Sequence, residues 1–166
     1  MSTLVKYGLM LAAGVIVWMF VMGFTGWYRH PMLVNLFFLV IPFQVFLLVQ
    51  ALRATARQGA GYRAQIGAAV AISSIAAILI FGASLVFTTV AFPSYFADIH
   101  AMQERLMREA GVSEDRIAEI LARAEREYTP MSQAIQGFFG TVITGLVTGA
   151  IAGRWIRHRP AGQASA

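Results

Sequence analysis

The chain has 166 residues, of which 58% are hydrophobic and only 13% are charged, and its mean hydropathy is +0.65. Soluble domains carry about a quarter charged residues, so this composition indicates a membrane protein. The absence of cysteine excludes a disulfide framework and a thiolate metal site. The net charge of +5 is better explained by the orientation of loops across a membrane than by binding to nucleic acid.

Four long uncharged runs lie along the chain, at residues 7–28, 30–52, 64–97 and 128–153. About 20 helical residues cross a hydrocarbon core of roughly 30 Å, so every run is long enough to span a bilayer. Strand-like alternation is absent, which argues against an outer-membrane barrel. We therefore predict an all-α fold, a single four-helix integral membrane bundle. Its spans are expected at about 7–28, 32–52, 65–92 and 132–153.

The first span begins near the N-terminus and superficially resembles a secretory signal peptide, with Lys6 as its basic region. Its apolar run is too long, however, and no small-x-small cleavage motif follows at the right distance. We expect this segment to be an uncleaved first helix.

The second span contains Pro42 in its middle, within the stretch LVIPFQVF. Proline has no backbone N–H, so we expect Pro42 to remove one helical hydrogen bond and to bend this helix. Gln44 and Gln50 follow the proline. A bent helix that carries amide side chains can line a binding site, but such groups are more often satisfied locally.

The window between the third and fourth spans predicts a helical hairpin over residues 94–128. Apolar residues recur there at helical spacing: Ile99, Met102, Leu106 and Ala110, then Ile117, Ile120, Leu121, Ala124 and Tyr128. Gly111 is placed to end the first helix and Ser113 to cap the second. The face formed by Ile117, Ile120, Leu121 and Ala124 is either a packed stripe under a solvated surface or a face that docks a partner protein or the outer leaflet.

Charge within the hairpin follows the helix dipoles, with acids toward first turns and arginines toward last turns. Glu104–Arg108 and Glu119–Arg123 are predicted as i,i+4 ion pairs.

Small residues recur at every fourth position of the fourth span: Gly137, Thr141, Gly145, Gly149 and Gly153. This spacing lets two helix backbones approach closely in a membrane. The expected partner is the third helix, which offers a small surface at Gly67, Ala71, Ser74 and Gly82. A second copy of the chain, in a homo-oligomer, is the alternative.

The separation of charge along the chain predicts an orientation. All eight acidic residues fall within residues 98–127, where five arginines leave a net charge of −3, whereas the remaining eight basic residues give +8. Seven of those eight lie on one side of the predicted spans: Lys6, Arg53, Arg57, Arg63, Arg154, Arg157 and Arg159. The positive-inside rule then places both termini, including the tail 154–166, in the cytoplasm, and the hairpin outside a bacterial inner membrane.

Several of these motifs together resemble a bacterial membrane family known as domain of unknown function 4199 (DUF 4199). They are the KYGL start, the aromatic-Pro exit from the third span, the acidic GVSEDRI hairpin and the TP entry into a Gly-rich final helix. The resemblance covers most of the chain. It implies four helices and a membrane location, and it supplies no activity, ligand or catalytic residue.

The spans contain no Asp, Glu, Lys, Arg or His in their central parts, although proton relays and intramembrane acid–base chemistry generally need one. The three histidines, His30, His100 and His158, lie in separate segments, and the chain has no phosphate loop, nucleophile elbow or HExxH motif. We expect no enzymatic activity, cofactor or bound metal. The preferred role is an accessory or scaffold protein in the lipid bilayer, with a membrane or periplasmic protein or a second copy as candidate partners. The alternative is a small oligomeric transporter or channel.

Overall fold

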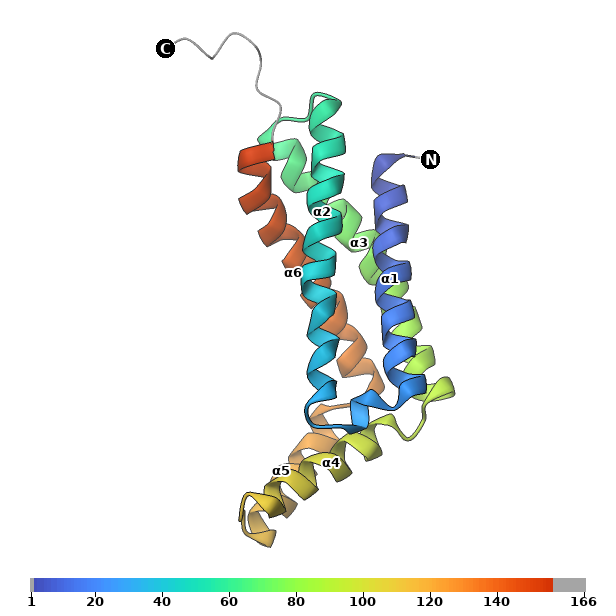
Figure 1. Ribbon diagram of the computed structural model, residues 1–166, viewed down its shortest axis with the longest axis vertical. Coiled ribbons are helices and arrows are strands. Elements are labelled where there is room, and N and C mark those ends of the chain that lie inside the picture. Colours follow the sequence, from blue (N-terminus) through green and yellow to red (C-terminus); the bar gives the residue numbers. More distant parts are fainter. Residues whose placement is uncertain (1, 157–166) are drawn as a thin grey trace.

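The computed structural model describes residues 2–156 (Figure 1). These residues form an all-α fold without strands, as predicted. The α-helices are α1 (Thr3–Thr25), α2 (Val40–Arg57), α3 (Tyr62–Val86), α4 (Tyr95–Glu109), α5 (Glu114–Glu127) and α6 (Pro130–Ile156). Two 3₁₀ segments, η1 (Trp27–Arg29) and η2 (Leu33–Leu39), and one π-helix, η3 (Phe87–Ala91), lie between them. Most of the predicted tail 154–166 lies outside the described residues.

Four helical segments among the described residues are long and apolar enough to cross a membrane, as predicted: Thr3–Thr25, Leu33–Arg57, Tyr62–Ala91 and Pro130–Ile156. The start of α1, the turn between α2 and α3, and the end of α6 lie together at one end of the molecule, which we call the terminal end (Figure 1). The segments η1, η2, α4 and α5 lie at the opposite end, the hairpin end. This arrangement is consistent with a multi-pass membrane protein.

The core between α1, α2 and α3 consists of two clusters of buried apolar side chains. One contains Leu11, Ala12, Val15, Leu47, Ala76 and Ile80. The other contains Leu48, Ala51, Leu52, Ala68, Ala69 and Ile72. Alanines supply much of both clusters, so α3 can lie close to its neighbours. Packing of this kind, rather than a hydrophobic drive, holds helices together in a membrane.

The first span ends earlier than predicted because Gly26 terminates α1. The backbone of Gly26 is left-handed, with φ at +68°, and its N–H donates to the carbonyl of Gly23. Glycine reaches this conformation without steric penalty, which makes it the usual residue at such a helix end. The chain then turns through η1, so Trp27 and Tyr28 lie outside the helix that was predicted to include them.

Pro42 lies in the first turn of α2 and not in the interior of an α-helix. The second span begins as the 3₁₀ segment η2, and α geometry starts only at Val40. A proline in a first helical turn is tolerated because its missing N–H has little to bond there. The structure thus shows a change of helix type just before the proline, and the bend at Pro42 stays a prediction. Trp18 stabilises the 3₁₀ part, since its indole N–H donates to the carbonyl of Leu36 at 3.1 Å.

The contact between α3 and α6 is made through small residues. A Cβ added to Gly149 would lie 2.8 Å from the Cβ of Ala69 and 3.2 Å from the backbone Cα of Ile66. Gly145 packs against the side chain of Ser73, and a Cβ on Gly153 would lie 3.0 Å from the Cβ of Gln65. These three glycines are buried, and α3 is the helix that they contact.

The other two residues of the predicted small-residue row lie away from this contact. A Cβ on Gly137 would have nothing within 4 Å, and Thr141 is partly exposed. The backbone carbonyl of Thr141 instead accepts a hydrogen bond of 2.8 Å from the buried amide of Gln44 on α2. The row therefore divides into a part that meets α3 toward the terminal end and a part that does not.

The surface of α3 that meets α6 also differs from the predicted one. Gly67 and Gly82 have nothing within 4 Å of an added Cβ, and the contacting residues include Gln65, Ala69 and Ser73. Prediction by residue size missed Gln65 because its side chain is large and polar. That side chain fits because it is satisfied by α2: its amide donates to the carbonyl of Leu52 at 3.1 Å and its oxygen accepts from the Thr55 hydroxyl at 2.9 Å.

Replacing Gly149 with Leu is expected to lower the thermal stability of the monomer in detergent. The new side chain would overlap Ala69 and the backbone of Ile66, and overpacking of this kind costs about 1–3 kcal/mol. Gly137→Leu is the matched control on the same helix. It should leave the melting temperature unchanged or slightly higher, because leucine has the greater helix propensity. Equal melting temperatures for the two variants would contradict the close contact.

Candidate functional site

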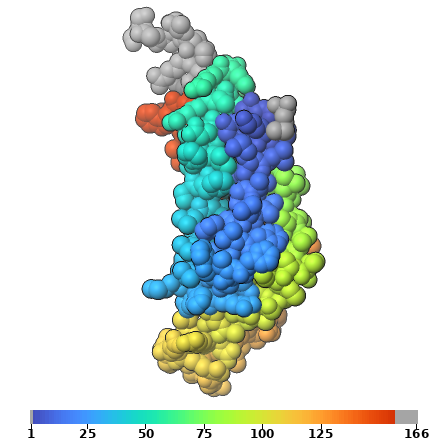
Figure 2. All heavy atoms as spheres, turned by 45° about the vertical axis from the view of Figure 1, so that its right-hand side comes forward, coloured from blue at the N-terminus to red at the C-terminus, as the bar shows by residue number. Residues whose placement is uncertain are grey.

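The helices α4 and α5 form a helical pair, which we call the hairpin (residues 95–127), beyond the ends of the four long helices (Figures 1 and 2). Gly111 turns the chain with φ at +75°. Its N–H donates to the carbonyl of Arg108, and the N–H of Val112 donates to that of Met107, so the last carbonyls of α4 are satisfied. Ser113 occupies the cap position of α5, but its side chain makes no capping hydrogen bond.

Arg108 joins the two helices of the hairpin. Its guanidinium lies 2.8 Å from Glu104 in α4 and 3.0 Å from Glu114 in α5. The hydrogen bond from Arg108 lowers the pKa of Glu114 below its ordinary value. All three side chains are solvated, so these pairs set the register of the hairpin more than they stabilise it.

The predicted pair between Glu119 and Arg123 is not formed. Glu119 pairs with Arg116 at 2.9 Å, and Arg123 pairs with Glu127 at 2.8 Å. Each arginine on this surface has acidic neighbours on both sides, and spacing alone does not choose between them.

The predicted apolar face of α5 is divided between a packed side and an open side. Ile117 is 2% exposed, whereas Ile120 is 39% exposed, and Leu121 and Ala124 are half-buried. Ile117 therefore belongs to the packing of the hairpin. Ile120 lies on a surface that residues 2–156 leave uncovered.

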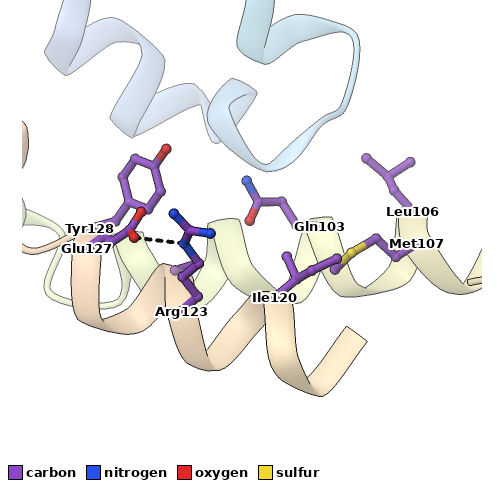
Figure 3. A pocket seen from close by; sticks show the side chains of 8 residues that line it. Gln103, Leu106, Met107, Ile120, Arg123, Glu127 and Tyr128 are labelled. Atoms are coloured by element: carbon purple, nitrogen blue, oxygen red, sulfur yellow. Dashed lines mark hydrogen bonds and ion pairs between the residues drawn. The ribbon is translucent and has the colours of Figure 1, made fainter. Parts of the chain in front are cut away.

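An open groove of about 440 Å³ runs between α4 and α5 on that surface (Figure 3). Its lining comprises Gln103, Leu106, Met107, Ile120, Arg123, Ala124, Glu127 and Tyr128. In Figure 3 Gln103, Leu106 and Tyr128 point toward the chain segment that joins α1 to α2, whereas Met107 and Ile120 point toward each other across the groove. The groove is thus apolar along its floor, and its charged members, Arg123 and Glu127, neutralise each other.

The hairpin is anchored to the four long helices at Asp98, in the first turn of α4. The hydroxyl of Tyr28 donates to Asp98 Oδ2 at 2.8 Å, and the guanidinium of Arg29 lies 2.9 Å from the same oxygen. The hydroxyl of Ser94 donates to it as well, at 3.0 Å. The sequence pattern did not pair Tyr28 and Arg29 with Asp98, because 70 and 69 positions separate them. The available signal was that Arg29 is the single charged residue of the stretch 7–52.

Burial of Asp98 raises its pKa, but the hydrogen bonds from Tyr28 and Ser94 and the charge of Arg29 outweigh burial, so the pKa is lowered overall. The pKa of Tyr28 is raised, first by burial and then by its bond to Asp98. The anchor therefore holds an ionised carboxylate and a neutral phenol at neutral pH.

Aromatic rings pack beneath this anchor: Phe20, Phe24, Tyr28, Phe87, Phe92 and Tyr95. The ring centroids of Phe87 and Phe92 are 4.6 Å apart, and those of Tyr28 and Tyr95 are 5.0 Å apart. Pairs at such distances contribute about 0.5–1.5 kcal/mol beyond their burial. The base of the hairpin is therefore held by packing as well as by charge.

No three His, Cys, Asp or Glu side chains within residues 2–156 come together in a way that would hold an ion. His100 lies in α4, and His158 lies outside the described residues.

Replacing Asp98 with Asn is expected to loosen the base of the hairpin. The variant keeps the shape of the side chain but loses the charge that holds Arg29 and the strong acceptor for Tyr28. Amides in the first turns of α4 should exchange with deuterium several-fold faster than in the parent. Glu125→Gln removes one negative charge from an exposed position of the same hairpin and should leave these rates unchanged. Identical exchange in all three proteins would show that Asp98 is not an anchor.

Acid should loosen the same contact. The pKa of Asp98 in the folded protein lies below its ordinary value of 3.8, so its contribution to stability is present above that value and is lost as the pH falls through the folded-state pKa. We expect equal protection of the α4 amides at pH 7 and at pH 5, and a decline only below about 3.8. A decline that begins between pH 7 and pH 5 would assign the effect to another group.

The comparisons with known proteins return one match. Residues 6–157 match the model of a family described as "Protein of unknown function (DUF4199)", which agrees with the resemblance carried by the KYGL start and the acidic hairpin. No curated protein and no solved structure matches the chain. Because the family match covers nearly all of the 166 residues, the chain belongs to this family, "Protein of unknown function (DUF4199)".

Proposed function

We propose that the protein is an accessory or scaffold protein of a bacterial inner membrane and that the hairpin is its partner-binding part. The observation that carries the proposal is the open groove between α4 and α5, which is lined from both helices and held on a fixed base. A helical pair needed only to connect two spans would not require an anchor, an aromatic base and an uncovered apolar face. Exposed apolar surface of this kind marks sites of interaction.

The distribution of charge supports the orientation. Basic residues at the terminal end are Lys6, Arg53, Arg57, Arg63 and Arg154, and two further predicted members, Arg157 and Arg159, lie outside the described residues. Under the positive-inside rule both termini are cytoplasmic and the hairpin stands on the outer side. The groove then lies at the outer membrane–water boundary, because Gln103, Leu106 and Tyr128 at its rim point toward the segment between α1 and α2 (Figure 3).

The shape and charge of the groove define the kind of partner. Helices of 15 and 14 residues are about 21–22 Å long, so the groove accepts an elongated occupant, such as one face of an amphipathic helix. Residues 98–127 carry eight acids and five arginines, which favours a partner with basic residues beside its apolar stripe. Since the groove faces the boundary, we propose a juxtamembrane helix of another membrane protein.

The proposal assigns no reaction to the chain. The central parts of the spans carry no charged side chain, and the two charged residues of the groove are paired with each other. Binding of a partner needs only the apolar floor and the surrounding charge.

A photo-reactive amino acid placed at position 120 tests the proposal in intact cells. Ile120 lines the groove, so the probe should form one discrete adduct with a second protein. Ala122 is exposed on the same helix but does not line the groove, and the probe placed there should form none. Ile120→Asp should then abolish co-purification of the adduct's protein, whereas Ala122→Asp should not.

Three outcomes would reject a heterologous partner. Adducts with lipid alone would show that the groove lies on the outer leaflet. An adduct at twice the 18.1 kDa mass of the chain would make a second copy the occupant. Equal labelling from positions 120 and 122 would show random collision.

A further inference from the structure

We propose that a cavity at the hairpin end of the four long helices binds a small neutral molecule with one aromatic ring and one hydrogen-bonding group, a compound of the phenol class. The cavity has a volume of about 170 Å³ and lies between α1, η2, η3 and the starts of α4 and α6. This site is separate from the hairpin groove, and its existence does not depend on a protein partner.

The volume sets the size of the ligand. A dry cavity of about 150 Å³ accommodates one benzene molecule. At about 170 Å³, the present cavity accommodates a single ring and one small substituent, and it opens to the surface beside the exposed rings of Phe37 and Phe38.

The side chains that line the cavity determine which kind of ligand it favours. Apolar contacts come from Met19 and Met22 on α1, Phe37 and Phe38 on η2, and Phe87 on η3. Thioethers and ring edges both make favourable contacts with an aromatic ring, and a flexible methionine adjusts to its outline. An aromatic ligand therefore gains more here than a saturated one of equal size.

Polar side chains at the same cavity select a neutral ligand with a hydrogen-bonding group. Tyr95 from α4 and Gln133 from α6 both line it, together with Asn35 from η2. Burial raises the pKa of Tyr95 against the opposing hydrogen bond with Gln133, and the neutral hydroxyl can donate or accept. The lining contains no charged residue, so a charged ligand would lose its hydration without compensation.

Two breaks in helix geometry meet at this cavity, and they belong to different spans. η2 is a 3₁₀ segment of the second span, and η3 is a π-helix at the end of the third, closed by the bond from the N–H of Phe92 to the carbonyl of Phe87 at 2.8 Å. Both kinds of segment recur at functional sites. At membrane depth such irregular backbone is tolerated where it is enclosed by protein or lines a cavity. The irregular helix segments and the chemistry of the lining therefore both indicate a binding site at this cavity.

Binding of 4-fluorophenol to the purified full chain in detergent, followed by ¹⁹F NMR, tests the site. We expect saturable binding of 4-fluorophenol, weaker binding of fluorobenzene, and none of 4-fluorobenzoate, which is charged at neutral pH. Val34 of η2 also lines the cavity, so Val34→Phe places a ring in it and should abolish binding. Val147→Phe makes the same change at a position of α6 that is 50% exposed, and it should bind like the parent. Binding that is equal in both variants would place the ligand elsewhere, in the micelle or on the surface.

A second variant keeps the test decisive if Val34→Phe does not fold. Gln133→Leu retains the volume of the side chain and removes its amide. It should lower the affinity for 4-fluorophenol about tenfold and leave the affinity for fluorobenzene unchanged. An unchanged ratio of the two affinities, or binding of 4-fluorobenzoate as tight as that of 4-fluorophenol, would overturn the proposal.

Discussion

Close approach of α3 and α6 is the constraint on which the other helix positions depend. Gly145, Gly149 and Gly153 remove side chains from one helix, and Ala69 and Ser73 present small ones on the other. In a bilayer, where lipid tails are as apolar as leucine, van der Waals packing of this kind is a main source of helix association. With α6 held against α3, α1 and α2 pack against α3 through the two apolar clusters, and α2 reaches α6 through its buried amide.

Polar side chains buried between the spans act as specific links in this apolar setting. The amide of Gln65 joins α3 to α2 through Leu52 and Thr55, and the amide of Gln44 joins α2 to α6. An unsatisfied amide in hydrocarbon is costly, so each link favours one register of its helices over neighbouring ones. The small-residue contact brings the helices together, and these amides select how they are aligned.

At the hairpin end, the segment η1 that follows α1 connects the four long helices to the hairpin. Tyr28 contributes its hydroxyl to Asp98, its ring to the aromatic packing and part of its surface to the cavity. Tyr95 shares the packing and the cavity from the hairpin side. The cavity is therefore built in part from the residues that hold the base of the hairpin.

The sequence by itself determined the helical class, the four spans and the family, because apolar runs of fixed length and a few ordered motifs carry that information locally. Pairing across the chain was decided by the tertiary structure alone. Residues 29 and 98 meet although no local pattern joins them, and Gln65 enters a small-residue interface because α2 satisfies its amide. The sequence also did not predict that α1 ends at Gly26 or that α geometry in the second span starts only at Val40, two residues before Pro42. Local periodicity specifies which face of a helix is apolar, but the identity of the neighbour depends on packing between segments far apart in the chain.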